Sequence, residues 1–266
     1  MGEKLIPSPL LLADRSPCLR RLVLRDLFAG EEHTTERAEV DRLALTDPLV
    51  TGLVEAQSEN GSWNARDIGS AWGAGGDLLA TAFVLTRLRY LGFDESFRAV
   101  RRGVAYLMSR QLPDGSWPLA RTNVEMDGKN SEDKGYTMIP LQTALPLRGL
   151  AAVGAAEMDF CEKAYDWLLE QRLDDGAWPT GIASGVHGYV GGYRRLAHSR
   201  WGCRSNTTGA LMCLALHPIR RQSEPARRAL DLILGREAHE SGPLGYYTAR
   251  LIGAETVGGF ITYYRT

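Results

Sequence analysis

Apolar and polar positions along the chain predict pairs of helices. In each pair, a helix that is apolar on most sides precedes a helix that is apolar on one side only. The stretch 77–91 carries apolar residues on two faces, which predicts a helix buried on more than one side. An amphipathic helix follows, with Asp94 as its expected N-cap and Gln111 at its end.

Similar pairs are expected along most of the chain. They fall at 136–153 followed by a helix from 159, at 206–217 and 223–235, and more weakly at 17–29 and 48–57. Asp159 with Glu162 resembles a capping box, and Pro140 and Pro146 are expected to kink or shorten the helix that contains them. The pattern at 244–264 leaves helix and strand open.

A short motif separates the helices and repeats three times. The copies are Gln57–Trp63, Gln111–Trp117 and Gln171–Trp178, each with a glycine two residues before the tryptophan. The glycines at 61, 115 and 176 are separated by steps of 54 and 61 residues. Such a spacing indicates repeated units of supersecondary structure, so about four stacked helical hairpins are expected.

Composition narrows the class of protein. The 266 residues carry a formal net charge of −1 and are 44% hydrophobic, which is typical of a folded globular chain without a basic excess for nucleic acid. The N-terminus lacks the pattern of a secretory signal, and the four cysteines lie far apart. We therefore expect reduced thiols and a cytoplasmic location.

The repeated motif resembles that of the terpene cyclase and protein prenyltransferase superfamily, which includes squalene–hopene cyclases. The resemblance covers about residues 45–240. It implies an all-α fold, a single (α/α) barrel or partial toroid over residues 1–266, with inner helices around a hydrophobic cavity. In that family the repeat is structural, so its glutamines and tryptophans are expected to tie neighbouring helices together.

The same resemblance points to Asp77 as a candidate acid. In class II cyclases an Asp-x-Asp-Asp-Thr-Ala signature opens an inner helix, and here Asp77, Thr81 and Ala82 match it. Leu79 and Ala80 replace the other two aspartates, so the usual proton donor is absent. The alternative is that Asp77 caps its helix.

Two further catalytic candidates lie beyond the second motif. Asp133 belongs to an acidic loop, for which a solvated surface is the simplest interpretation. Tyr136 is expected to open the next inner helix, from which it would face the cavity.

The long connection 181–204 is the second informative segment. Its arginines and histidines suit a diphosphate or carboxylate, and a basic surface loop is the alternative. The anion-binding candidates are His187, Arg194, Arg195, His198, Arg200 and Arg204. The aromatic candidates for the cavity lining are Trp72, Phe83, Tyr189, Tyr193 and Trp201.

No cofactor or metal is expected. Cys213 and His217 have the spacing of zinc ligands, with Cys203 and His198 upstream. Trp201 stands where the zinc-binding prenyltransferase subunits have an aspartate, which makes that class the least favoured.

The sequence therefore predicts an atypical class II-like terpene cyclase or isomerase that acts on a prenyl or polyene chain by acid-initiated carbocation chemistry. The alternative is a non-catalytic isoprenoid-binding or partner-binding domain of the same fold. Four hairpins are fewer than a closed toroid needs, so exposed apolar surface, a homodimer and peripheral membrane contact are also expected.

Overall fold

The computed structural model describes residues 8–28, 33–66, 76–117, 119–120, 136–137, 140–179, 196 and 198–237. Over these residues the fold is all-α, apart from two short strands that pair antiparallel, β1 (Leu119–Ala120) and β2 (Tyr136–Thr137). The helices are α1 (Ser8–Leu12), α2 (Pro17–Asp26), α3 (Thr34–Ala44), α4 (Pro48–Glu55), α5 (Gly76–Tyr90), α6 (Arg98–Ser109), α7 (Pro140–Ala152), α8 (Asp159–Glu170), α9 (Arg204–Leu216) and α10 (Glu224–Glu237).

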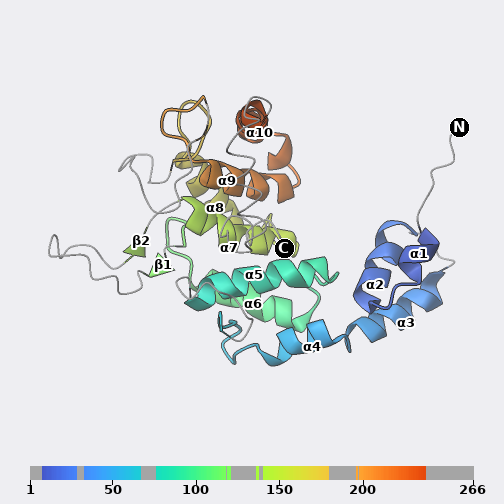
Figure 1. Cartoon of the computed structure of the whole chain (residues 1–266). Coiled ribbons are helices and arrows are strands. Elements are labelled where there is room, and N and C mark those ends of the chain that lie inside the picture. Colours follow the sequence, from blue (N-terminus) through green and yellow to red (C-terminus); the bar gives the residue numbers. More distant parts are fainter. Residues whose placement is uncertain are drawn as a thin grey trace, which may run out of the picture.

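Three helical hairpins form the body of the molecule: α5 with α6, α7 with α8, and α9 with α10 (Figure 1). The first helices of the hairpins lie side by side, because α5 packs on α7 and α7 packs on α9. We call α5, α7 and α9 the inner helices and their partners the outer helices. This order agrees with the expected stacking of hairpins.

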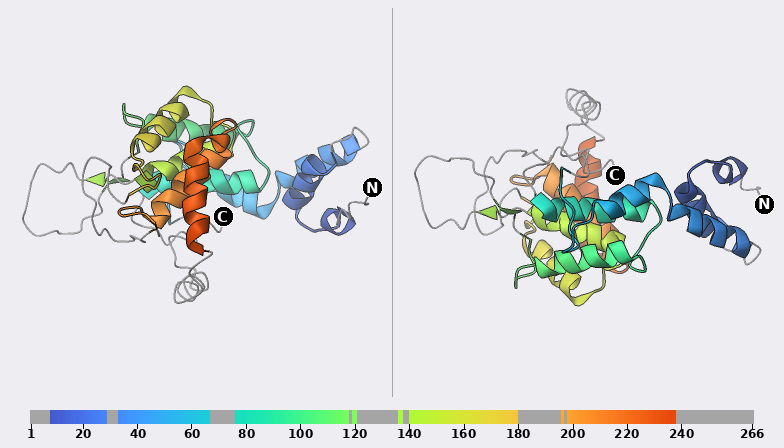
Figure 2. Two further views of the ribbon diagram at one scale, coloured as in Figure 1. Left: turned by 90° about the horizontal axis from the view of Figure 1, so that it is seen from above. Right: turned by 90° about the horizontal axis from the view of Figure 1, so that it is seen from below.

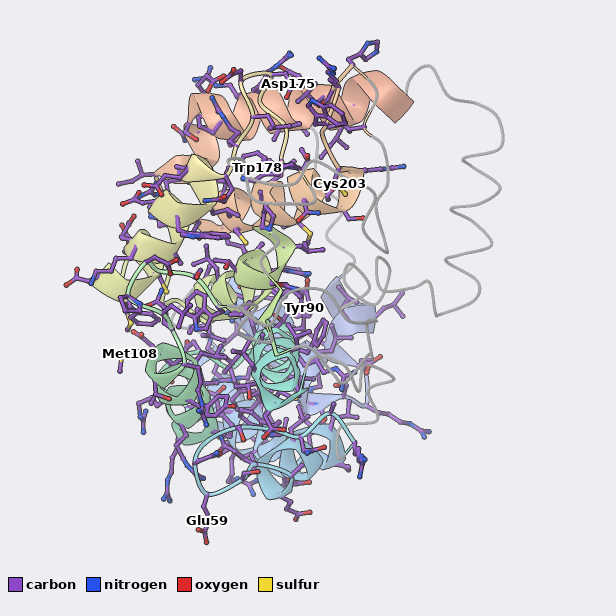
Figure 3. All side chains as sticks on the ribbon, turned by 90° about the vertical axis from the view of Figure 1, so that its left-hand side faces the viewer. Glu59, Tyr90, Met108, Asp175, Trp178 and Cys203 are labelled. Carbon is purple, nitrogen blue, oxygen red and sulfur yellow. The ribbon has the colours of Figure 1, made fainter. Side chains whose placement is uncertain are left out.

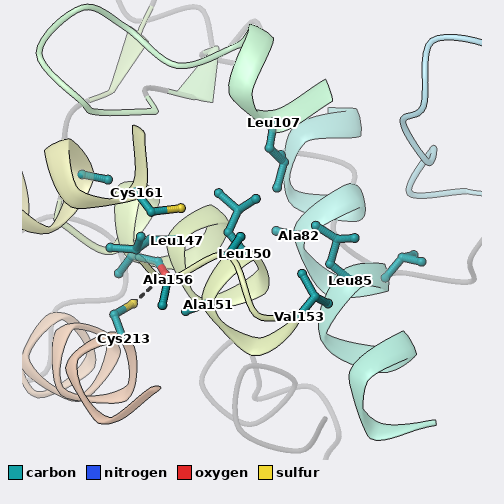
Figure 4. Packing of buried hydrophobic residues seen from close by; sticks show 14 of the residues in the cluster. Ala82, Leu85, Leu107, Leu147, Leu150, Ala151, Val153, Ala156, Cys161 and Cys213 are labelled. Carbon is teal, nitrogen blue, oxygen red and sulfur yellow. Dashed lines mark hydrogen bonds between the residues drawn. The ribbon is translucent and has the colours of Figure 1, made fainter. Parts of the chain in front are cut away.

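Burial of the helices follows the apolar pattern of the sequence. Helix α5 is buried continuously from Leu79 to Thr86, and α7 from Thr143 to Ala151. The outer helix α6 buries one face, which includes Val100 and Leu107. Figure 4 shows the resulting core, in which Leu147 and Leu150 lie between α5 and Cys213 of α9.

Helices α1–α3 stand beside the body and are joined to it through α4 (Figures 1 and 2). The cap residues explain where two of these helices begin: Ser16 accepts the Leu19 N–H before α2, and Asp47 accepts the Leu49 N–H before α4. A proline occupies the first position of each helix, where no intrahelical N–H is needed. Helix α3 lies between the two predicted helices of the opening pair, and the apolar pattern did not predict it.

Three local predictions are wrong. Helix α6 begins at Arg98 with Phe97 as its N-cap, because Asp94 accepts the Ser96 N–H in a preceding turn. Helix α8 has Met158 as its N-cap and no side-chain capping bond, so the expected capping box is absent. Tyr136 lies in β2 and not at the start of an inner helix, since α7 begins only at Pro140.

Candidate functional site

The three motif loops share one set of contacts around a fully buried tryptophan. Each indole N–H donates to a carbonyl of the preceding helix, at Leu53, Leu107 and Leu168 with distances of 2.6, 2.8 and 2.6 Å. The backbone N–H groups of Trp63, Trp117 and Trp178 donate to the hydroxyls of Thr81, Thr143 and Thr207 at 3.1, 3.1 and 3.0 Å. Each loop therefore joins the helix before it to the inner helix after it.

The first two glutamines connect neighbouring outer elements. Gln57 Nε2 donates to the carbonyl of Ala99 at 2.9 Å, and Gln111 Nε2 donates to that of Phe160 at 2.7 Å. In the third loop the residue four before the glycine is Arg172 and not Gln171, so the repeat match on Gln171 is one residue out of register. Arg172 forms an ion pair of 2.7 Å with Glu224 of α10.

Asp77 lies in the first turn of α5, beside the first motif loop. Its Oδ1 accepts a hydrogen bond of 3.3 Å from the Asn64 amide, and its backbone carbonyl accepts the Thr81 hydroxyl at 2.6 Å. The helix begins at Gly76, so Asp77 is a first-turn residue and not the residue that precedes the helix. The carboxylate is partly exposed.

The candidate ring Phe83 belongs to a small apolar cluster that adjoins the main core through Leu78 and Leu141. Its buried members are Leu79, Phe83 and Leu145, with Leu78 and Leu141 packed against them, and all lie on α5 or α7. Leu85 faces the outer helix α6, where Gly103 approaches it. At about 100° per residue, Phe83 points about 160° away from Leu85 and therefore away from α6. We call this cluster the inner face.

Asp77 lies outside the inner face. On the same helical geometry it is about 120° around α5 from Phe83 and about 160° from Leu79. The structure thus brings the candidate acid to the end of the helix that carries the inner face, with its carboxylate turned toward the motif loop.

A buried cation on α7 was not predicted from the sequence. Arg148 is only 5% exposed, and its Nη2 lies 3.4 Å from the hydroxyl of Tyr90 at the end of α5. An arginine in the middle of an otherwise apolar helix was the available signal. Arg148 places a positive charge one turn beyond Leu145 along α7.

The end of the long connection folds against the third motif. Trp178 and Cys203 are both fully buried, whereas Asp175 is half-buried near the edge of the molecule (Figure 3). The Cys203 N–H donates to the Trp178 carbonyl at 2.7 Å, and the Ser199 hydroxyl donates to Asp175 at 2.6 Å.

Four candidates from this segment lie on the described residues. Trp201 is 42% exposed, and the guanidinium of Arg200 sits 5.0 Å from its ring centre. His198 is exposed and has a φ of 59°, and Arg204 opens α9. The structure thus brings Arg200 and Trp201 together and places neither on the inner face.

Seven candidates lie outside the described residues. They are Trp72, Asp133, His187, Tyr189, Tyr193, Arg194 and Arg195.

The residues weighed as zinc ligands make other contacts. The Cys213 thiol donates to the Ala144 carbonyl at 2.9 Å, and burial raises the thiol pKa to about 12. His217 Nε2 lies 2.7 Å from Glu162, and its Nδ1 accepts the N–H groups of Ile219 and Arg220. Within the described ranges, no three His, Cys, Asp or Glu side chains are grouped as metal ligands would be.

Paired helices joined by Gln- and Trp-bearing loops define this chain as an (α/α) repeat protein of the terpene cyclase type. The squalene-hopene cyclase C-terminal domain family matches residues 34–192, and the chain belongs to that family. In the part of the chain that the structure describes, no helix is both long and apolar enough to cross a bilayer.

Named relatives agree with this assignment. A squalene–hopene cyclase of Zymomonas mobilis is 29% identical over 163 residues, covering 60% of this chain and 23% of the relative. A lanosterol synthase of Candida albicans is 30% identical over 197 residues, covering 68% of this chain and 26% of that relative. A squalene–hopene cyclase of Alicyclobacillus acidocaldarius is 28% identical over 201 residues, covering 53% of this chain and 32% of that relative. The chain therefore spans about a quarter to a third of the length of these relatives.

Proposed function

We propose that this chain binds a prenyl or other polyene chain along the inner face and is an atypical class II-like terpene cyclase or isomerase. The observation that carries the proposal is the inner face itself: Leu79, Phe83 and Leu145 form a cluster beside the main core, on the side of α5 that faces away from α6. Membership of the squalene-hopene cyclase C-terminal family supports a polyene as the ligand that these buried apolar side chains contact.

The chemistry of the inner face fits a carbocation reaction. Its aliphatic side chains shield a hydrocarbon from water, and a phenylalanine ring stabilises a nearby cation through its quadrupole by about 1–2 kcal/mol. Tyr90, two turns beyond Phe83 on α5, and Arg148, one turn beyond Leu145 on α7, supply a polar, positively charged neighbour. An isoprenoid with an anionic head group would orient that head toward Arg148.

Three groups remain candidates for the initiating acid. Asp77 lies in α5 and Tyr136 in β2, and Asp133 lies outside the described residues. Because Asp77 turns toward Asn64, its proton has to reach the substrate from the end of α5 and not from the middle of the inner face. This placement favours a second candidate function, in which the domain binds an isoprenoid without protonating it.

Product analysis tests the proposal and separates the two functions. The full chain is incubated with squalene, farnesyl diphosphate and geranylgeranyl diphosphate, and products are identified by gas chromatography and mass spectrometry. We expect a cyclised or isomerised product that is lost in Asp77→Asn or Asp133→Asn and retained in the exposed control Glu95→Gln. Saturable binding of these probes without any product would support the binding function, and absence of binding would overturn both.

Self-association and membrane contact form part of the same proposal. Several large apolar side chains of the outer helices are exposed, among them Leu230 and Leu234 on α10. We expect a dimer in sedimentation and weak binding to lipid vesicles. A monomer at micromolar concentration would contradict the dimer.

A further inference from the structure

A pocket between α2 and α3 has no place in the function proposed above. It is an open pocket of about 360 Å³, lined by Arg21, Leu24, Arg25, Arg37 and Asp41. The first three residues come from α2 and precede the part of the chain that matches the cyclase family, which begins at residue 34. The pocket lies beyond the C-terminal end of α5, where Arg21 contacts Gly92.

Positive charge dominates this pocket. Its lining holds three guanidinium groups against the single carboxylate of Asp41, which leaves two positive charges. Asp26 pairs with Arg25 from outside the lining, and one positive charge remains when it is counted.

Two of the three arginines have carboxylate partners. Arg21 Nε donates to Asp41 at 2.6 Å, and Arg25 donates two hydrogen bonds to Asp26 at 2.7 and 3.1 Å. Arg21 is further fixed by the Gly92 carbonyl at 3.0 Å and by the Phe93 ring at 4.6 Å. These contacts hold the Arg21 guanidinium in place before any ligand arrives, which reduces the entropy lost on binding.

Arg37 differs from the other two. Its Nη2 donates to the Leu24 carbonyl at 3.3 Å, while its Nε is buried and has no hydrogen-bond partner. Among the described ion pairs, none includes Arg37. Arg37 therefore contributes a positive charge to the lining that an anion in the pocket would neutralise.

We propose that this pocket binds a phosphate group. The three arginines line the pocket from two helices and offer donors in several directions, which suits a tetrahedral oxyanion better than a planar carboxylate. A phosphate monoanion also balances the one positive charge that remains once Asp26 is counted. The phosphate comes either from a free inorganic anion or from a lipid head group, and the chemistry of the site is the same for both.

Binding measurements on the full chain test the site and separate the two sources. The probes are inorganic phosphate and pyrophosphate by titration calorimetry, and phosphatidylcholine vesicles with and without phosphatidic acid by co-sedimentation. We expect saturable binding to at least one probe, weakened by sodium chloride. Binding to the free anions identifies the soluble source, and binding only to vesicles with phosphatidic acid identifies the lipid.

Matched variants tie the binding to the pocket. Arg37→Gln and Arg25→Gln should each weaken binding by about tenfold, because each removes charge-assisted hydrogen bonds. Arg42→Gln removes an exposed arginine of α3 outside the lining and should leave the affinity unchanged. Arg25 is exposed, so its variant carries the test if Arg37→Gln fails to fold. Absence of binding to every probe, or equal loss in Arg42→Gln, would overturn the proposal.

Discussion

The hydroxyl of Thr81 accepts the backbone N–H of Trp63 at 3.1 Å, and this bond connects the first motif loop to an inner helix. Thr81 also donates its proton to the Asp77 carbonyl one turn earlier at 2.6 Å. The hydroxyl therefore acts as donor and acceptor at once, in a fully buried position. Thr143 and Thr207 repeat the bond to Trp117 and Trp178, so the matching threonines are parts of the scaffold.

Replacing this hydroxyl should destabilise the fold. Thr81→Val keeps the side-chain shape but leaves the Trp63 N–H buried without an acceptor, which should lower the free energy of unfolding by about 1–3 kcal/mol. Thr86→Val is the matched control, because the Thr86 hydroxyl only donates to the Ala82 carbonyl of its own helix. Urea denaturation of both variants checks the difference, and equal losses would count against the scaffold role.

The motif glycine combines a left-handed backbone with close contact. Gly115 has a φ of 91°, and a Cβ there would lie 2.5 Å from the Lys163 carbonyl oxygen. Gly115→Ala should lower the free energy of unfolding by ~3 kcal/mol or more, because it adds backbone strain and a steric clash. Gly154 has a φ of 102° with open space around it, so Gly154→Ala should cost only the strain, about 1–2 kcal/mol. Similar unfolding midpoints for the two variants would refute the close approach.

Glu162 should make stability depend on pH. Burial raises the pKa of its carboxyl, but hydrogen bonds from His217 and Arg220 lower it, and the net direction is downward from the ordinary value of 4.5. A carboxyl with a lowered folded-state pKa stabilises the protein above the unfolded value, and this contribution disappears as pH falls through the folded value.

The melting temperatures of Glu162→Gln and the wild-type chain test this dependence. We expect the variant to melt lower near pH 7 and the difference to shrink below pH 4.5. Asp231→Asn, on the exposed side of α10, should show no such convergence. A gap that stays constant with pH would argue against the pairing.

Variants at two leucines of α5 should distinguish the role of the inner face from that of the main core. Leu85 is completely buried against α6, so Leu85→Ala should lower the free energy of unfolding by about 3–5 kcal/mol. Leu79 packs in the smaller cluster. Compared with Leu85→Ala, Leu79→Ala should lower the free energy of unfolding less but weaken polyene binding more. Denaturation and binding titrations on the same two variants measure both effects. Parallel losses in both assays would remove the distinction between the two faces.

The helix pairs were predictable because burial on all sides and burial on one side leave different apolar periods in the sequence. The starts of α2, α4 and α8 also followed local signals, but the caps of α6 and α8 did not. Asp159 and Glu162 have the spacing of a capping box, yet Glu162 pairs with His217 and Arg220 from beyond α9. No local pattern contains that pairing.

The candidate site was predictable only in part. Phe83 was named from its place on an apolar helix, and the structure puts it on the inner face. Arg148 was missed because a single arginine among apolar residues gives no repeating pattern. Arg172 was missed because the neighbouring glutamine matched the motif by type while lying one residue away in the loop.

Photo-crosslinking tests whether a polyene binds along the inner face. A farnesyl chain that carries a diazirine is bound to the full protein and irradiated, and labelled peptides are mapped by mass spectrometry. We expect saturable labelling of α5 and α7 around Phe83 and Leu145, displaced by unlabelled polyene. Labelling confined to the outer helices, or labelling that excess polyene leaves unchanged, would contradict it.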